Sequence, residues 1–500
     1  MNSRESFNKL LEHLKQVSKF NYAAALMGWD LRTYMPKGGA QGRAEIIGAV
    51  ETEGFKLFIS DSTEYLLSEL LPALNEFDSE EQAFIKVIDR VYQRSRKIPP
   101  ELFEKFSVLK SKADGIWREA KAKSDFTIFC STLEQIIGIT KQFANLYGYE
   151  KNPYDALLPS YEPGITTDEI NSIVVSLREK IVPFFHKLME SLSKPNDKIL
   201  YGDFEPAKQE KLLLEILERI GFNFSEGRLD VTEHPFETSV GPNDCRLTVK
   251  YHPDNFAPAL FGAIHETGHG LFEQGKSNLL KWLSIDGSYS LGLHESQSRM
   301  WENLVGRSLP FWKFFYPKLQ GTFPDFKGIP LRDFYCSINV AKRSPIRIHA
   351  DEVSYNLHIM LRFEIEVALL KGEIKIKDLP VLWNEKMQEY IGITPKNDAE
   401  GVLQDMHWSM GAFGYFPTYM LGNLIASQLF TKVKYEIPNL EEEFFSGNFH
   451  SLLSWLRTHI HPYGLIHTAS EFLENITGEK LNPQYWISYI EEKFSDIYDI

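Results

Sequence analysis

Two histidines four positions apart, with a glutamate directly after the first, occur in the stretch AIHETGHGLF (Ala263 to Phe272). Apolar or small residues recur around them at the i, i+3, i+4, i+7 spacing of one buried helix face. On such a helix His265 and His269 lie one turn apart on the same side, so both imidazoles can reach one metal ion. Glu266 projects beside them, where it can accept a proton from a water molecule at that ion. The alternative is a pair of hydrogen-bonded histidines on a polar helix face, and the flanking sequence has to decide.

A third ligand is needed, because a catalytic zinc site uses three protein ligands and keeps one position for water. The stretch LGLHESQSRMWENLVG (residues 291–306) has helical spacing and contains Glu295, 26 positions after His269. In gluzincin peptidases the third ligand is a glutamate from a second, downstream helix. His294 competes with Glu295, but neighbours on a helix point about 100° apart, so only one of them faces the ion. We expect Glu295 to be that ligand.

The elements around these residues are mostly helical. The pattern is helical from Met1 to about Leu200, with a break at SKPNDK (residues 193–198), and it returns to long helices with short loops from Ile338 onward. The helix carrying the two histidines is expected to begin after an N-cap at Asn255 and to stop at Gly275. This pattern predicts a mostly α-helical protein.

The exception lies just before the histidine-bearing helix. The stretches RLDVTEHPFETSV and CRLTVKY flank GPND (residues 241–244), and β-branched residues occupy alternate positions in each. This predicts a hairpin or strand pair. A strand beside a cleft can offer backbone groups to an extended peptide.

Composition and charge narrow the class of protein. The net charge of -14 argues against a nucleic-acid partner. The three cysteines, Cys130, Cys245 and Cys336, are widely spaced and predict neither a disulfide framework nor a thiolate zinc site, which favours a reducing compartment. The N-terminal stretch mixes charges with leucines and lacks the apolar run of a signal peptide, so a cytoplasmic location is expected.

One uncharged segment has the length of a membrane span. No charged residue occurs from Trp408 to Thr431, but the segment contains Pro417, Asn423 and three glycines. It therefore lacks the near-continuous apolar run that spanning requires. We expect buried helix and loop there and no membrane partner.

Five further motifs, in order with the histidine-bearing helix, make the chain resemble the carboxypeptidase Taq family of metallocarboxypeptidases. They are HPF (residues 234–236), DCRLT (244–248), HESQ (294–297), IRIHAD (346–351) and GVLQDMHW (401–408). Each motif is weakly specific alone, whereas six in order over residues 234–408 are strongly specific, and no motif position departs from the family pattern.

The resemblance implies removal of amino acids one at a time from peptide C-termini, with broad side-chain tolerance. It implies one Zn²⁺ per chain, with Co²⁺ as an alternative, and a homodimer. It also implies a single catalytic unit over residues 1–500, with a long groove between two halves as in oligopeptidases such as neurolysin. Residues 1–200 would form a wall or lid of that groove, and residues 201–500 would carry the metal site.

Donors besides the metal are needed for the oxyanion that forms during peptide hydrolysis. His407 is the first candidate, and Tyr415 and Tyr419 of GYFPTY follow it closely. Core packing is the competing explanation for either tyrosine, so His407 ranks above both. Asp351 and Asp405 are interpreted as carboxylates that orient a histidine or an arginine.

Cleavage at the C-terminal end of a peptide requires a cationic group that binds the terminal carboxylate. Arginine suits this role because its planar guanidinium group can donate hydrogen bonds to both carboxylate oxygens. The candidates for substrate binding are Arg347 in IRIHAD, on an expected helix, Arg246 in DCRLT, and His234 in HPF. Alternatively, each arginine pairs with a neighbouring aspartate, Asp351 or Asp244, and braces the fold.

The sequence thus predicts a metal-dependent carboxypeptidase with Glu266 as general base. A zinc endo-oligopeptidase or dipeptidase is the nearest alternative, because the metal chemistry does not distinguish end cleavage from internal cleavage. A binding protein that keeps the helix only as structure is disfavoured, because a structural site has no use for a base at Glu266. A helical scaffold without metal would be excluded by metal analysis.

Overall fold

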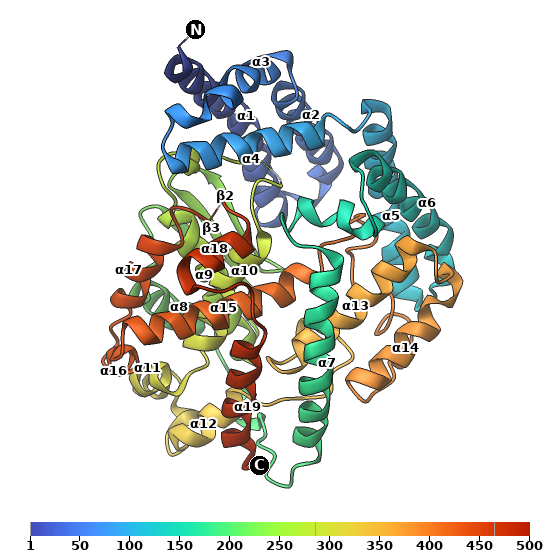
Figure 1. Cartoon of the computed structure of the whole chain (residues 1–500). Coiled ribbons are helices and arrows are strands. Elements are labelled where there is room, and N and C mark those ends of the chain that lie inside the picture. Colours follow the sequence, from blue (N-terminus) through green and yellow to red (C-terminus); the bar gives the residue numbers. More distant parts are fainter. Residues whose placement is uncertain (1, 286, 465) are drawn as a thin grey trace.

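The computed structural model describes residues 2–285, 287–464 and 466–500, and within them the chain forms 19 α-helices and one small sheet (Figure 1). The helices that precede the sheet are α1 (Ser3–Arg32), α2 (Ala40–Phe58), α3 (Asp61–Leu70), α4 (Ser79–Ser95), α5 (Pro100–Lys123), α6 (Thr127–Tyr147), α7 (Thr167–Glu190) and α8 (Pro206–Arg219). The predicted helical character of this part is confirmed. The predicted break at residues 193–198 lies directly after α7.

The helices after the sheet are α9 (Ala257–Gly275), α10 (Leu291–Arg299), α11 (Leu309–Thr322), α12 (Leu331–Ile338), α13 (Ser354–Lys371), α14 (Leu379–Tyr390), α15 (Pro417–Glu436), α16 (Leu440–Phe445), α17 (His450–His459), α18 (Ala469–Thr477) and α19 (Gln484–Tyr498). A π-helical segment, η7 (Met300–Val305), continues α10. The expectation of short loops was wrong in one place, because residues 391–416 form turns without a helix or strand.

The sheet has three strands, β1 (Gly227–Val231), β2 (Glu237–Gly241) and β3 (Asp244–Val249), in the order β1-β3-β2. The predicted hairpin is the antiparallel pair β2 and β3. Asn243 in its turn has φ of 59°, a left-handed conformation that asparagine tolerates better than most residues. The first predicted arm contains two strands, β1 and β2, rather than one, and an irregular stretch separates them. Strand β1 pairs with β3 in parallel. As a result, β2 is an edge strand of the sheet.

Helix α9 begins at Ala257 rather than directly after Asn255, and it ends at Gly275 as expected. The Asn255 side chain nevertheless accepts a hydrogen bond from the Ala257 backbone N–H at 3.0 Å, so it satisfies a free donor of the first turn. The helix crosses α10 closely at Gly268, where a Cβ atom would lie 2.5 Å from the Cα of Ser298. Only glycine permits this approach, which brings the two candidate ligand-bearing helices together.

Helix α15 packs against α10 in the same way. A Cβ atom on Gly422 would lie 2.5 Å from the Cγ of Glu295.

The uncharged segment from Trp408 to Thr431 forms turns and a buried helix, as predicted. No helix in the described part of the chain is long and apolar enough to cross a membrane.

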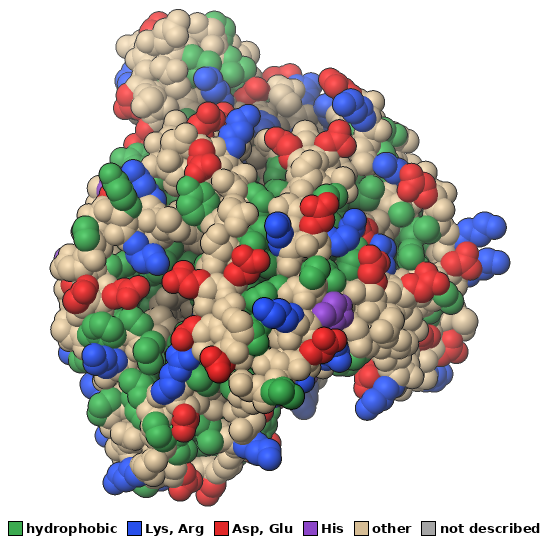
Figure 2. Space-filling view, turned by 60° about the horizontal axis from the view of Figure 1, so that its bottom comes forward, with side chains coloured by type: hydrophobic (Ala, Val, Ile, Leu, Met, Phe, Trp, Pro, Cys, Tyr) green, Lys and Arg blue, Asp and Glu red, His purple; other side chains and the backbone are tan. Residues whose placement is uncertain are grey.

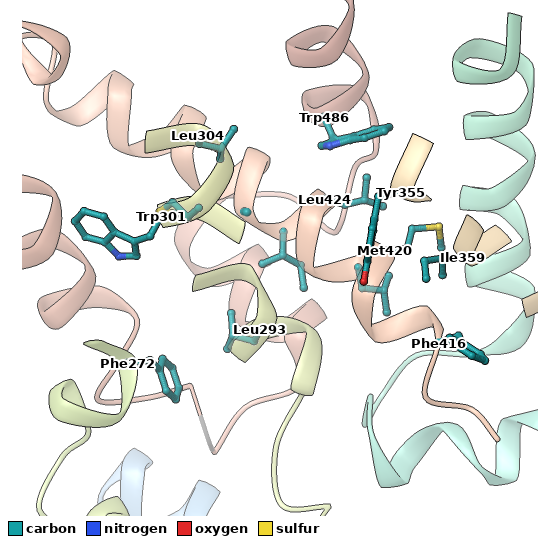
Figure 3. Packing of buried hydrophobic residues seen from close by; sticks show 14 of the residues in the cluster. Phe272, Leu293, Trp301, Leu304, Tyr355, Ile359, Phe416, Met420, Leu424 and Trp486 are labelled. Atoms are coloured by element: carbon teal, nitrogen blue, oxygen red, sulfur yellow. The ribbon is translucent and has the colours of Figure 1, made fainter. Parts of the chain in front are cut away.

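Apolar side chains from α9, α10, η7, α13, α15 and α19 fill the core beside these helices (Figure 3). Those labelled in the figure are Phe272, Leu293, Trp301, Leu304, Tyr355, Ile359, Phe416, Met420, Leu424 and Trp486. On the face shown in Figure 2, acidic and basic side chains are interspersed without a large area of one sign.

Candidate active site

Three potential metal ligands converge between α9 and α10. The Nε2 atoms of His265 and His269 lie 3.8 Å and 3.3 Å from Oε2 of Glu295. One donor atom from each residue lies within 4.8 Å of the other two, and all three side chains are largely buried. Two imidazole nitrogens and one carboxylate oxygen form a typical three-ligand catalytic zinc set.

The surroundings set the protonation of these ligands. Burial lowers the pKa of His269 to about 3, so its ring is neutral and can donate a lone pair. Burial opposes ionisation of Glu295, but the guanidinium of Arg299 and the ring of His265 outweigh it and hold the pKa of Glu295 well below its usual range. The carboxylate is therefore charged, as a metal ligand must be.

Two further side chains orient the ligands. His265 Nδ1 lies 2.9 Å from Oε2 of Glu302, and the Nε of Arg299 donates to Oε1 of Glu295 at 2.8 Å. A hydrogen bond from Nδ1–H to a carboxylate fixes the tautomer that leaves Nε2 available for a metal. Sequence reasoning missed both residues. Arg299 and Glu302 follow Glu295 by four and seven positions, so helical periodicity places them on the same face and could have indicated them.

The structure brings Glu295, rather than His294, to the two histidines. The His294 ring stacks on the His269 ring, with centroids 4.4 Å apart and an interplanar angle of 20°. Its Nε2 lies 3.4 Å from Oε1 of Glu273, away from the donor group. His294 therefore supports a candidate ligand from the side.

Glu266 is a buried carboxyl group on the same helix as His265 and His269. Burial raises its pKa to about 7, the nearby charge of Glu295 acts in the same direction, and His265 opposes both. A carboxyl group whose pKa lies near neutrality can both accept and release a proton at working pH.

The three candidate oxyanion donors form one cluster. Nε2 of His407 lies 3.3 Å from the Tyr419 hydroxyl, and the ring centroids of His407 and Tyr415 are 5.5 Å apart. Burial lowers the pKa of His407 to about 3, so the ring is neutral. Burial raises the pKa of Tyr415 to about 12, and the charge of Glu295 adds to this, so the phenol keeps its proton.

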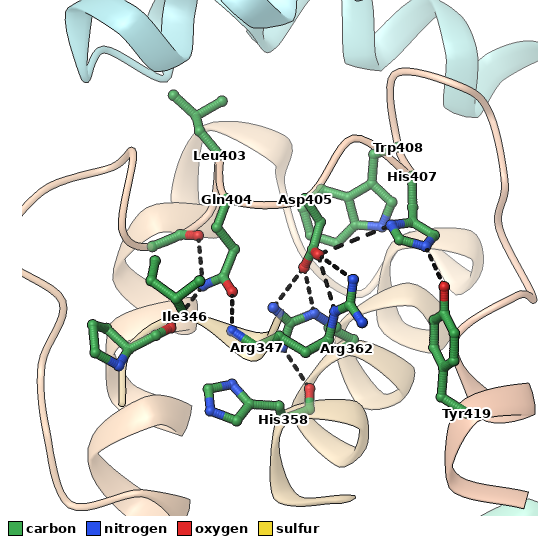
Figure 4. Close-up of polar contacts among 12 residues, drawn as sticks. Ile346, Arg347, His358, Arg362, Leu403, Gln404, Asp405, His407, Trp408 and Tyr419 are labelled. Atoms are coloured by element: carbon green, nitrogen blue, oxygen red, sulfur yellow. Dashed lines mark hydrogen bonds and ion pairs between the residues drawn. The ribbon is translucent and has the colours of Figure 1, made fainter. Parts of the chain in front are cut away.

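Arg347 is buried and bound to a distant aspartate (Figure 4). Its Nε and Nη2 donate to Oδ1 of Asp405 at 3.0 and 2.9 Å, and its Nη1 donates to the Tyr355 hydroxyl at 3.0 Å. Arg362 binds the other oxygen of Asp405 through its Nε at 2.6 Å. The interpretation of Asp405 as a carboxylate that orients an arginine is therefore confirmed.

The expected helix at Arg347 and the interpretation of Asp351 as a carboxylate that orients a histidine or an arginine were wrong. Arg347 starts a short 3₁₀ turn, η9 (Arg347–His349), rather than sitting on a longer helix, and it does not pair with Asp351. Asp351 instead accepts from the backbone N–H groups of Val353 and Ser354 at 2.9 and 3.1 Å, so it caps α13. An aspartate so close to a helix start is captured by the unpaired backbone donors there.

The candidates on the sheet lie differently. Both Nε and Nη2 of Arg246 donate to Asp244, at 2.5 and 2.9 Å, and the guanidinium stacks 4.7 Å from the ring centre of Trp29 on α1. This is the neighbouring pairing stated above as the alternative to substrate binding. His234 is exposed on the connection between β1 and β2.

Comparison with known proteins decides the family. The model of the carboxypeptidase Taq (M32) metallopeptidases matches residues 9–494. The chain belongs to this M32 family. It is 40% identical over 486 residues to carboxypeptidase 1 of Bacillus subtilis, covering 97% of each chain, and 36% identical over 513 residues to thermostable carboxypeptidase 1 of Thermus thermophilus, covering 100% of each. The solved carboxypeptidase of Pyrococcus furiosus matches with a TM-score of 0.95 and 36% identity over 99% of each chain.

As a member of the M32 family the chain is a metal-dependent carboxypeptidase, a peptide hydrolase. The His265, His269 and Glu295 group fits the divalent metal that such an enzyme uses, because its donors converge and one imidazole is already oriented by a carboxylate. The mostly α fold with one small sheet also agrees with the M32 neighbours.

Proposed function

We propose that this M32 carboxypeptidase releases C-terminal amino acids from peptides of varied sequence, with Glu266 as the general base. His265, His269 and Glu295 would hold one zinc ion, or alternatively a cobalt ion. The observation that carries the proposal is the convergence of these three donors beside a buried Glu266 on the same helix. The bound ion would act as a Lewis acid that polarises the scissile carbonyl and makes the attacking water more acidic.

The chain's own residues would then move the proton and stabilise charge. Glu266 takes a proton from the attacking water and delivers it to the departing amine, a cycle that a pKa near neutrality favours. His407 is the first-ranked donor to the developing oxyanion, and Tyr415 and Tyr419 are further donors. The edge of β2 that faces away from β3 is proposed to pair with the backbone of the extended substrate.

The direct test is the mass of the products from a long peptide with both ends free, with and without a chelator. A ladder shortened one residue at a time from the C-terminus, and abolished by the chelator, is the expected result. Internal fragments would favour the endo-oligopeptidase alternative. A dipeptidase would leave the long peptide uncut.

Arg347 is the proposed anchor for the substrate carboxylate, with Arg246 and His234 as further candidates. Arg347→Ala should raise KM and lower kcat/KM for free-acid peptides with metal content unchanged, because losing a charge-assisted pair costs roughly 1.5 to 3 kcal/mol. Arg347→Lys should recover only part of the loss, because an ammonium cannot hold both oxygens. Kinetics on matched free-acid and C-terminal amide peptides, together with metal analysis, measure this.

The control is Arg332→Ala, which removes a surface arginine paired with Asp496 at 2.6 Å and should leave kinetics unchanged. The native enzyme should discriminate strongly against amides. Equal cleavage of amides and acids would show that the carboxylate is not recognised. A defect in Arg246→Ala but not in Arg347→Ala would move the anchor to the sheet.

The assembly and location are proposals carried by the family resemblance. We propose a cytoplasmic homodimer in which residues 1–200 form a wall or lid of the substrate groove. The three cysteines are free thiols, which agrees with a reducing compartment.

A further inference from the structure

Helix α13 presents two oppositely charged and fully buried side chains, one helical turn apart, to the segment that carries His407. Arg362 and Glu366 are each 0% exposed. Arg362 binds Asp405 at the start of the segment, as described above. Glu366 has no role in the proposed chemistry, yet a buried carboxylate is retained there at a considerable cost in desolvation.

Glu366 accepts hydrogen bonds from both ends of one turn. Its Oε1 accepts from the indole Nε1–H of Trp408 at 2.9 Å, and its Oε2 accepts from the backbone N–H of Gly414 at 3.1 Å. Oε2 also accepts from the Tyr154 hydroxyl at 2.8 Å, which comes from the short helix η3 (Pro153–Ala156). Trp408 directly follows His407, and Gly414 directly precedes Tyr415. One carboxylate therefore joins the two points where the candidate oxyanion donors are attached.

This turn depends on such contacts for its shape. It belongs to neither a helix nor a strand, and Gly411 and Gly414 within it have φ of 67° and 96°. An ionised carboxylate offers acceptors on both oxygens, whereas an amide offers an acceptor on one side only. Two fixed N–H donors on opposite oxygens can therefore be satisfied together only by a carboxylate.

We propose that Glu366 is a positioning residue that sets the separation and orientation of His407 and Tyr415 for the reaction. It acts through the 408–414 turn and does not touch the substrate. The inference rests on the proposed function, specifically on His407 and Tyr415 as oxyanion donors.

The test begins with Glu366→Gln, which keeps the shape of the side chain and removes one acceptor. Either Trp408 or Gly414 then loses its partner, and the turn relaxes. We expect kcat to fall by about tenfold to a hundredfold, because a displacement of about 1 Å has effects of this size. KM should change little and metal content should stay unchanged, because the candidate ligands lie on α9 and α10.

The matched control is Glu364→Gln on the same helix. Glu364 accepts from the Tyr390 hydroxyl at 2.8 Å and pairs with Arg178 and Lys386, all outside the described site. This variant should lose stability without a fall in kcat. Equal kcat values for the two variants would overturn the positioning role.

A double-mutant cycle separates positioning from general stability. In the His407→Ala/Tyr415→Phe background, Glu366→Gln should lower kcat by less than about twofold, because the groups through which it acts are gone. The same fall as in the native background would overturn the inference. If Glu366→Gln does not fold, Trp408→Phe removes one of the two anchored donors and should show the same dependence on background.

The outcome also distinguishes this inference from the proposed function. If His407→Ala/Tyr415→Phe hydrolyses peptides at the native rate, the oxyanion assignment is wrong and the role of Glu366 falls with it. If that variant is slow while Glu366→Gln is as fast as the native enzyme, only the positioning role is wrong.

Discussion

Replacing Glu266 with glutamine should reduce peptide hydrolysis by at least about a hundredfold, the lower end of the range for losing general acid–base catalysis. The amide cannot accept the proton of the attacking water or deliver it to the leaving amine. Metal content should stay near that of the native enzyme, because His265, His269 and Glu295 are unchanged. Metal per chain by mass spectrometry and kcat on a free-acid peptide measure the two quantities separately.

A control is Glu364→Gln on α13, whose carboxylate accepts from the Tyr390 hydroxyl at 2.8 Å outside the described site. It changes the same functional group and should retain most of the activity. Near-normal hydrolysis by Glu266→Gln would show that another group is the base. Loss of metal in Glu266→Gln would instead make the variant uninformative about proton transfer and would assign Glu266 to metal retention, which contradicts the proposal.

Replacing Glu295 with alanine should lower metal affinity by more than about a hundredfold, because losing a ligand exceeds the ten- to hundredfold loss typical of residues that only orient ligands. Activity should fall with metal occupancy. His294→Phe should keep the metal, since it preserves the ring that stacks on His269 and removes only the nitrogens. Titration with Zn²⁺ against a competing chelator gives both affinities.

The opposite pattern, with metal retained in Glu295→Ala and lost in His294→Phe, would exchange the two roles. Loss of metal in both variants would show that metal binding requires the ring nitrogens of His294 as well as the stacking of its ring on His269. A thermal melt of each apo variant checks that the fold survives. Glu295 also binds Arg299, so some loss of stability is expected in Glu295→Ala.

Much of the site could be predicted from the sequence because its parts follow local rules. The i, i+4 spacing of His265 and His269 places both rings on one helix face whatever surrounds the helix. The angle between helix neighbours allows only one of Glu295 and His294 to face the ion, and the gluzincin arrangement favours the glutamate. The structure brings Glu295 to both histidines. The same periodicity, extended by two turns, would have indicated Glu302.

Some features of the fold could also be predicted from local sequence patterns. Helical periodicity and turn residues located the break at residues 193–198 and the hairpin turn at Asn243. The parallel pairing of β1 with β3 was missed, because alternation of side chains shows that a strand has two faces but not which strand lies beside it.

Only the tertiary structure decided which distant residues pair. Arg347 binds Asp405, 58 positions away, because the nearer Asp351 is taken by the unpaired backbone donors at the start of α13. The contacts of Glu366 with Trp408 and Gly414 likewise join segments more than 40 positions apart. Such pairings depend on how closely helices approach, as at Gly268 and Gly422, and this is set by the packing of whole side-chain surfaces. Sequence spacing determined which side chains share a helix face, whereas helix packing determined which faces meet.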